Sequence, residues 1–454
     1  MSIESLNPAT GEPIAVYEET PPAEVARAVE AAHQAFVAWR EVSFAERSRL
    51  MGAAAAVLRE RRREYAALMA NEMGKPFGGG LSEVEKCAWA CEFYAEQAAA
   101  FLAPEEVATD AARSYVLFQP LGVVLAVMPW NFPFWQVFRF AAPGLMAGNA
   151  AVLKHASNVP GCALAIAEVF RAAGFPADLF RTLLIGSRDV ERVIEHPRIT
   201  AVTLTGSGAA GRAVAGKAGS LLKKTVLELG GSDPYLILED ADLDAAVQTC
   251  VASRLINSGQ SCINAKRFLV PRRLGPEIER RFVAAMAAQK VGDPLAEQTQ
   301  VGPLARRDLR DELHRQVEAS RRAGARCLLG GEIPAGPGAF YPPTVLAEVG
   351  PGMPAYEEEL FGPVAALIAV DGDEEAIEVA NSSAFGLGSA VLTRDIRRGE
   401  AIARRLDAGC CFVNDLVKSD PRLPFGGIKQ SGYGRELGTF GIREFVNIKT
   451  VYVK

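Results

Sequence analysis

The chain has 454 residues, enough for two to four domains of ordinary size, roughly 150 residues each. Hydrophobic residues make up 49% and charged residues 23%, and these globular proportions exclude a disordered or collagen-like protein. The net charge of −5 gives no basic surface for nucleic acid, so we expect none as a partner. The polar, acidic start does not resemble a signal peptide, and the weakly polar run at 140–153 is too short for a membrane span. We therefore expect a cytoplasmic protein that does not bind a membrane.

The first half of the chain changes from helices to an alternating pattern. Apolar periodicity predicts helices over 23–40 and 44–71, the second as one long helix. A strand-like stretch at 114–128 is interrupted at 120–122. Beyond it, strands are predicted at 150–153, 182–185, 201–205 and 225–229, with helices at 161–173, 189–195 and 209–218. This alternation predicts a doubly wound parallel sheet.

The second half repeats the alternation after Gly230 and Gly231. Helices are predicted at 243–257, 275–289 and 304–323, with strands at 268–270, 327–329, 365–370, 390–392 and 411–413. The tail at 447–453 alternates like a strand but has no neighbour in sequence to pair with. We expect it to pair elsewhere, with another subunit as one option.

The thiols do not form a disulfide or zinc pattern. Eight Cys and four His are scattered without ligand spacing, so we predict reduced cysteines and no metal site. Cys262 differs from the others because it ends a polar, Gly-containing loop at 257–262 that a substrate could reach. A thiolate there would be a nucleophile. The alternative is a small core residue.

Three other segments suggest catalytic or binding chemistry. Gly206–Gly211 follows a strand and opens a helix, as in a dinucleotide-binding loop, although an ordinary tight turn fits as well. Glu228 ends an apolar strand before paired glycines and is a candidate general base, or else a salt-bridged residue. Asn131 lies between two prolines, where its amide could hold an oxyanion or cap a turn.

At these residues the sequence resembles the aldehyde dehydrogenase superfamily along essentially the whole chain. Seven segments occur in the family's order: 129–133, 154–157, 205–207, 228–231, 259–262, 359–363 and 424–432. The resemblance implies two doubly wound, Rossmann-like α/β domains and a small β oligomerisation element. The cofactor-binding domain would comprise 1–113 and 126–229, the catalytic domain 230–430, and the oligomerisation element 114–125 and 431–454. A homodimer or homotetramer would follow.

The resemblance also implies a mechanism. The Cys262 thiolate adds to an aldehyde, and the Asn131 amide with the Cys262 backbone N–H holds the oxyanion. Hydride then passes to a nicotinamide and leaves a thioester. Glu228 activates the water that hydrolyses it to a carboxylic acid.

Cofactor contacts are implied by the same motifs. Lys154 would bind the adenosine ribose, Gly206 and Ser207 the pyrophosphate, and Glu359 and Phe361 the nicotinamide end. The remaining residues expected around the cofactor are Trp130, Asn131, His155, Ala156, Ser157 and Leu229. NAD-preferring relatives often have Glu where this chain has Ser157, so we predict NADP as the cofactor, with NAD as the alternative.

The substrate prediction depends on Arg139, which lies among aromatic residues in a predicted helix at 132–140. It could bind a substrate carboxylate or form a salt bridge within the protein. The resemblance is greatest to compact bacterial succinate semialdehyde dehydrogenases, in which residues equivalent to Arg139 and Ser419 bind the carboxylate. A second Arg of that group is Ile256 here, so either Arg139 and Ser419 suffice, Arg422 or Lys418 compensates, or the substrate differs.

Three other functions are each compatible with part of this sequence pattern. A CoA-acylating relative would not need the base at Glu228. A structural or binding protein of the same fold would not need Cys262, Glu228, Asn131 and Lys154 together. An alcohol dehydrogenase with Glu228 as the ribose ligand fits the loop spacing but leaves the Cys262 loop without a role.

Overall fold

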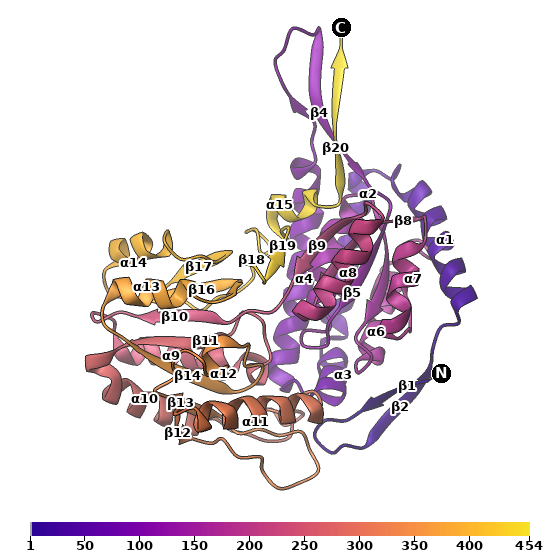
Figure 1. Cartoon of the computed structure of the whole chain (residues 1–454). Helices are drawn as coiled ribbons and strands as arrows, with labels where there is room; N and C mark the ends of the chain where they lie inside the picture. The colour runs from indigo at the N-terminus through magenta and orange to yellow at the C-terminus, as the bar shows by residue number, and fades with distance from the viewer. Residues whose placement is uncertain (1) are drawn as a thin grey trace.

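The computed structural model describes residues 2–454, and two parallel sheets form its two halves (Figure 1). The first sheet has the order β19-β9-β8-β5-β6-β7. Its strands are β5 (Val123–Met128), β6 (Ala150–His155), β7 (Phe180–Thr182), β8 (Ile199–Thr205), β9 (Lys224–Glu228) and β19 (Gly432–Tyr433). Neighbours are parallel except β19, which pairs antiparallel with β9. The chain adds β6 and β7 on one side of β5 and then β8 and β9 on the other, which makes the boundary between β5 and β8 a topological switch point.

The helices of the first half pack around this sheet. They are α1 (Pro22–Trp39), α2 (Phe44–Glu60), α3 (Arg62–Met73), α4 (Phe77–Phe101), α5 (Trp135–Met146), α6 (Pro160–Ala172), α7 (Val190–Glu195) and α8 (Gly208–Ser220). The single helix predicted at 44–71 is wrong, because Arg61 (φ −98, ψ 17) breaks it into α2 and α3. The break lets both helices contact α4. Helix α4 was not predicted from the sequence, because its small residues give little helical periodicity.

The second sheet has the order β12-β13-β14-β11-β10-β16-β17 and is parallel except for β12. Its strands are β10 (Asp233–Ile237), β11 (Ala265–Pro271), β12 (Arg326–Leu329), β13 (Thr344–Ala347), β14 (Val364–Val370), β16 (Gly388–Leu392) and β17 (Cys410–Val413). The helices of this half are α9 (Leu243–Leu255), α10 (Gly275–Ala287), α11 (Arg307–Arg322), α12 (Pro354–Glu357), α13 (Asp373–Asn381) and α14 (Ile396–Ala403). The predicted fold class, two doubly wound α/β halves, is confirmed.

A β arm extends from the body and carries the C-terminus (Figure 1). It consists of β3 (Glu105–Glu106), β4 (Arg113–Pro120) and β20 (Val446–Val453), in the order β20-β4-β3. The predicted tail strand therefore pairs within its own chain, in register from Val446↔Pro120 to Val453↔Arg113. The arm leaves apolar side chains exposed, including Ile448 at 64% and Tyr452 at 51%. Such an exposed apolar edge is typical of a contact surface.

Several short elements join these parts. They are the β1 (Ser2–Leu6) and β2 (Pro13–Glu18) hairpin, the β15 (Phe385–Gly386) and β18 (Ile428–Lys429) pair, and α15 (Gly438–Arg443). Residues 123–125 and 432–433 lie in the first sheet and not in the arm. The domain ranges otherwise stay a prediction. Within residues 2–454, no helix is both long and apolar enough to cross a membrane.

The two sheets meet end to end, and this junction places the candidate site. β9 ends at Glu228, and Gly230 and Gly231 lead directly into β10. The carboxyl ends of the first sheet therefore face the amino ends of the second. Cys262 lies just before the amino end of β11, and it is brought to the same junction.

Candidate active site

The loop that carries Cys262 has an unusual backbone. After α9, the 3₁₀ turn Ile256–Gly259 places Asn257, Ser258 and Gly259 at φ 54, 56 and 80. Two consecutive non-glycine residues in the left-handed region are costly and are kept only where the surroundings impose them. At Gly259 a side chain is excluded, because a Cβ atom would lie 2.2 Å from the carbonyl carbon of Gly362.

Hydrogen bonds hold this strained loop in place. Asn257 Nδ2 donates to the Asn131 carbonyl at 2.6 Å. Ser258 Oγ accepts from the Gly302 N–H at 2.9 Å, and Gln260 Oε1 accepts from a backbone N–H at 2.9 Å. Bonds to the first half and to the segment before α11 therefore fix the direction in which Cys262 projects.

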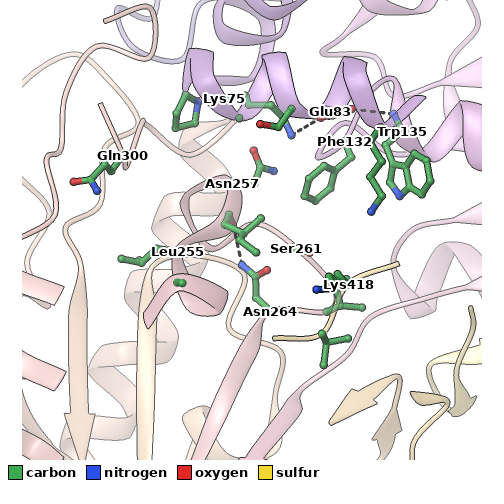
Figure 2. Close-up of a pocket in the computed structure, with 18 of the residues that line it drawn as sticks. Lys75, Glu83, Phe132, Trp135, Leu255, Asn257, Ser261, Asn264, Gln300 and Lys418 are labelled. Atoms are coloured by element: carbon green, nitrogen blue, oxygen red, sulfur yellow. Dashed lines mark hydrogen bonds and ion pairs between the residues drawn. The ribbon is translucent and has the colours of Figure 1, made fainter. Parts of the chain in front are cut away.

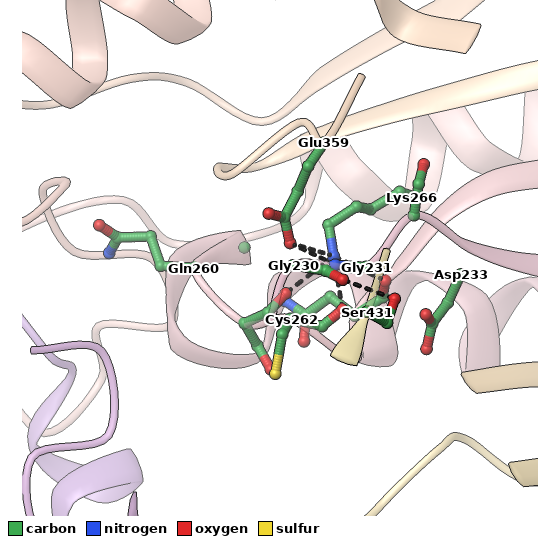
Figure 3. Close-up of polar contacts among 12 residues, drawn as sticks. Gly230, Gly231, Asp233, Gln260, Cys262, Lys266, Glu359 and Ser431 are labelled. Atoms are coloured by element: carbon green, nitrogen blue, oxygen red, sulfur yellow. Dashed lines mark hydrogen bonds and ion pairs between the residues drawn. The ribbon is translucent and has the colours of Figure 1, made fainter. Parts of the chain in front are cut away.

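Cys262 is half-buried and lines a cavity of about 810 Å³. Burial raises the pKa of the Cys262 thiol to about 12, although Arg139 and Lys266 lower it. Lys266 Nζ donates to the Cys262 carbonyl at 2.8 Å and approaches Glu359 at 3.4 Å (Figure 3). The thiol therefore needs a proton acceptor to become a nucleophile.

Glu228 is the candidate for this proton acceptor. It is 1% exposed, and neither carboxylate oxygen has a hydrogen-bond partner among residues 2–454. Burial raises the pKa of Glu228 well above its usual range, and its charge is felt at Cys262. Gly426 makes room for it, since a Cβ there would lie 2.7 Å from Glu228 Oε1. A buried carboxyl with a raised pKa and no salt bridge fits a general base.

Asn131 lies in the turn after β5, 4% exposed. Its Nδ2 donates to the carbonyl of Gln260, two residues before the nucleophile, at 3.2 Å. An amide nitrogen has two hydrogens, so a second remains for an oxyanion. The side chain is directed at the Cys262 loop, and the turn-capping alternative is not what the structure contains.

Arg139 also lines the cavity, but its charge is paired with a carboxylate of the protein. Arg139 and Glu436 form an ion pair in which both side chains are almost fully buried. Its guanidinium also donates to Thr205 Oγ1 at 3.2 Å and lies 4.8 Å from the centre of the Phe425 ring. This is the internal salt bridge that the sequence left open as the alternative to a substrate clamp.

Ser419 lies on the cavity wall, as does Ile256. Ser419 Oγ accepts hydrogen bonds from Lys86 Nζ at 2.8 Å and from Trp135 Nε1 at 3.1 Å. The two residues considered as substitutes for the missing Arg are paired within the protein: Lys418 with Asp415 and Arg422 with Asp420.

Helix α4 also contributes to the wall of the Cys262 cavity, which was not predicted from the sequence. Glu83 Oε1 accepts from the backbone N–H groups of Phe134 and Trp135, both at 2.9 Å. Its other oxygen pairs with Lys75 at 2.6 Å (Figure 2). Glu83 thus holds the start of α5, and Lys86, one turn further along α4, reaches the cavity. Nothing in the sequence distinguishes Glu83 and Lys86 from the other charged residues of α4, since their burial arises only from the packing of this helix.

A dinucleotide would fit at the switch point of the first sheet. Ser207 caps α8 by accepting from the Ala210 N–H at 3.3 Å, and the positive end of the helix dipole at this N-terminus suits a phosphate. Gly211 packs against Leu229 so closely that a Cβ would lie 2.6 Å from it. This close contact between helix and strand is the role of the third glycine in a dinucleotide-binding loop.

The segment after β6 adds a cation to this site. Lys154 is 7% exposed and forms no salt bridge with any residue of 2–454, and burial lowers its pKa. The exposed Ser157 follows it. His155 is turned inward, bonds the Pro133 carbonyl at 2.9 Å and accepts from the Ala156 N–H at 2.8 Å. Burial lowers the pKa of His155 to about 4, so it is neutral and orders the segment.

The other predicted cofactor residues lie where the sheets meet. Glu359 accepts from the Gly231 N–H at 3.0 Å and contacts Lys266 (Figure 3). Trp130 and Phe361, from opposite halves, form an edge-to-face pair with ring centres 5.7 Å apart. Both aromatic rings and Glu359 therefore lie between the switch point and the Cys262 loop.

Comparison with known proteins decides the family. The sequence profile of the aldehyde dehydrogenase family matches residues 1–451. The chain belongs to the aldehyde dehydrogenase family. It is 49% identical over 458 residues to succinate-semialdehyde dehydrogenase (NADP(+)) 1 of Mycobacterium tuberculosis, covering 100% of both chains. It is 47% identical to the Escherichia coli succinate semialdehyde dehydrogenase (NAD(P)+), covering 99% of this chain and 97% of that one. A Streptococcus pyogenes succinic semialdehyde dehydrogenase crystallised with NADP+ is 38% identical, with a TM-score of 0.97 and 99% coverage of both.

As an aldehyde dehydrogenase, the chain has its predicted motifs at one junction. Cys262, Glu228 and Asn131 converge from three separate segments, and Lys154, Ser207 and Glu359 lie along the adjoining sheet ends. Arg139 differs, because it is in the cavity wall but bonded to the protein. The roles of these residues stay predictions.

Proposed function

We propose that this aldehyde dehydrogenase oxidises succinate semialdehyde to succinate with NADP+, with NAD+ as the alternative cofactor. The observation that carries the reaction type is the buried Glu228 carboxyl, which has no hydrogen-bond partner among residues 2–454 and lies close enough to raise the pKa of the Cys262 thiol. The relatives at 47% and 49% identity, which are succinate semialdehyde dehydrogenases, support the substrate and cofactor. A cavity of about 810 Å³ is large enough for a four-carbon aldehyde beside Cys262.

Deprotonation of Cys262 begins the reaction. Burial raises the pKa of Glu228 well above its usual range, which makes its carboxylate a stronger base toward the thiol proton. The sulfur then bonds to the aldehyde carbon, and the carbonyl oxygen becomes an alkoxide. The Asn131 amide and the Cys262 backbone N–H stabilise that charge. Losing one such donor costs about 100- to 1,000-fold in rate.

Hydrolysis ends the reaction on the same cysteine. When bound, NADP+ would supply the acceptor for the hydride of the adduct, and Cys262 would then hold an acyl thioester. Glu228, once it has released the thiol proton to solvent water, takes a proton from the attacking water molecule, whose oxygen adds to the thioester carbon. The C–S bond then breaks and releases the carboxylate and the Cys262 thiolate. Burial of the unpaired Glu228 suits water activation, which a CoA-dependent enzyme would not need.

Cofactor binding is assigned to the switch point. Lys154 would hold the adenosine ribose and attract the 2′-phosphate of NADP+, which the neutral Ser157 does not repel. Gly206 and Ser207 would bind the pyrophosphate at the N-terminus of α8. Glu359 and Phe361, with Trp130, would bind the nicotinamide end.

The β arm supports a further part of the proposal. Its exposed apolar residues on β20 would be covered by another copy of the chain in a homodimer or homotetramer. A cytoplasmic location also belongs to the proposal.

Steady-state kcat/KM with a panel of aldehydes, and with NADP+ and NAD+ in parallel, tests the proposal. We expect the highest value with succinate semialdehyde and NADP+, and free succinate as product without CoA. Replacing Cys262 by Ala is expected to abolish turnover. Acyl-CoA as the sole product, or activity retained without the Cys262 sulfur, would refute the mechanism.

A further inference from the structure

The cationic side chains of the cavity are not equivalent. Four line it: Lys75, Lys86, Arg139 and Lys418. Three are paired with protein carboxylates: Lys75 with Glu83, Arg139 with Glu436 and Lys418 with Asp415. Across residues 2–454, Lys86 has no carboxylate within ion-pair distance. Its charge is therefore the one in this cavity that the protein leaves uncompensated.

The surroundings of Lys86 make its uncompensated charge energetically costly. The side chain extends from α4, Nζ donates to Ser419 Oγ at 2.8 Å, and it lies 4.3 Å from the centre of the Trp135 ring. Both contacts are to neutral groups. Burial, and next the charge of Arg139, lower the pKa of Lys86 to about 8 against weaker opposing effects. Those opposing effects come from Cys87, Glu83 and Asp420. A buried cation without an anion is disfavoured, so an anionic ligand would relieve the cost.

Ser419 adds a second donor beside this charge. Its oxygen already accepts from Lys86 and from the Trp135 indole N–H at 3.1 Å. A hydroxyl that accepts two hydrogen bonds still has its own hydrogen to donate. An ammonium and a hydroxyl hydrogen side by side match the two oxygens of a carboxylate.

The positions of Lys86 and Ser419 suit a contact with the end of the substrate opposite its aldehyde group. Lys86 and Ser419 line the cavity of Cys262 and also an open surface groove of about 860 Å³. They therefore lie where the cavity opens to that groove. A substrate with its aldehyde at Cys262 would have its other end toward this opening.

We propose that Lys86 is the ion-pair partner of the substrate carboxylate, beside the Ser419 hydroxyl, for which the resemblance already implies a contact with that carboxylate. The inference rests on the proposed function, because it assumes a carboxylated aldehyde. It assigns to Lys86 the specificity role that the resemblance implied for Arg139, whose charge Glu436 neutralises. It also provides the cation missing at Ile256.

The test is Lys86→Met, which keeps the length of the side chain and removes its charge. We expect kcat/KM for succinate semialdehyde to fall about 10- to 100-fold, the effect of one hydrogen bond to a charged group. The value for butanal, which has no carboxylate, should change less than about threefold by the same reasoning. Lys418→Met is the matched control, since it removes a cation of the same cavity that Asp415 already pairs. It should leave the ratio of the two values unchanged.

The outcomes separate the two proposals. If the wild-type enzyme does not prefer succinate semialdehyde over butanal, the proposed substrate is wrong and the inference falls with it. If the wild type has the preference and Lys86→Met keeps it, the inference alone is overturned. Equal losses on both aldehydes would indicate a structural role and would also overturn it. Lys86→Arg, which retains a cation, should recover part of the preference, and thermal melting shows whether each variant is folded.

Discussion

The Arg139–Glu436 ion pair leads to a prediction about stability and activity. Both side chains are almost fully buried, at 2% and 3% exposure, so replacing Arg139 by Met leaves Glu436 as an unpaired buried acid. Breaking such a pair costs about 3–5 kcal/mol. Replacing Glu436 by Gln as well removes the stranded charge, so the double variant should be more stable than Arg139→Met alone.

Urea unfolding of the wild type, both single variants and the double variant gives the coupling free energy. Activity provides the second measurement. Arg139 lowers the pKa of Cys262, so its loss should reduce kcat/KM for succinate semialdehyde and for butanal alike. If Arg139→Met instead unfolds like the wild type and loses activity on succinate semialdehyde alone, Arg139 is the substrate clamp and the internal pair is incidental.

Three other predictions follow from charges in the two binding sites. Ser157→Glu should lower kcat/KM with NADP+ more than with NAD+, because a carboxylate repels the 2′-phosphate; an unchanged ratio would remove Ser157 from cofactor selection. With the pKa of Cys262 near 12, alkylation of the cofactor-free enzyme by iodoacetamide should accelerate about tenfold per pH unit between about pH 7 and 9, and a plateau in that range would contradict the buried thiol. Lys86 loses its proton above its pKa of about 8, so the ratio of kcat/KM for succinate semialdehyde to that for butanal should fall above this pH, and should stay flat in Lys86→Met.

Much of the fold could be predicted from the sequence because its signals are local. Strand β5 is a continuous apolar run, and the break at Gly122 (φ +142) needs a glycine beside Thr200. The helix predicted at 44–71 was wrong because both its parts are helix-forming, and the turn at Arg61 serves contacts with α4 that are distant in sequence. The tail strand was found, but its partner β4 lies more than 300 residues earlier, and no local pattern specifies that pairing.

The candidate site likewise contains residues that could be predicted from the sequence and residues that could not. Cys262, Glu228 and Asn131 could be named because each lies in a motif that departs from its apolar surroundings. The use of Arg139 could not be predicted, because its partner Glu436 is almost 300 positions away. Lys86 was missed for the complementary reason: a cation is notable only when the fold brings no carboxylate to it, and absence of a partner is a property of the three-dimensional structure.

The electrostatics of the cavity connect these observations. Folding brings Arg139 to Glu436 and Lys266 to Glu359, and both pairs lie close enough to influence Cys262. Among residues 2–454, two ionisable groups that the proposed reaction uses have no ion partner: the acid Glu228 and the cation Lys86. Burying an ionisable group without a partner lowers the stability of the fold. Such groups are typical of functional sites, where they take part in the reaction. Glu228 can exchange a proton with sulfur or water, whereas Lys86, at the opening of the cavity, can acquire its partner from the substrate itself.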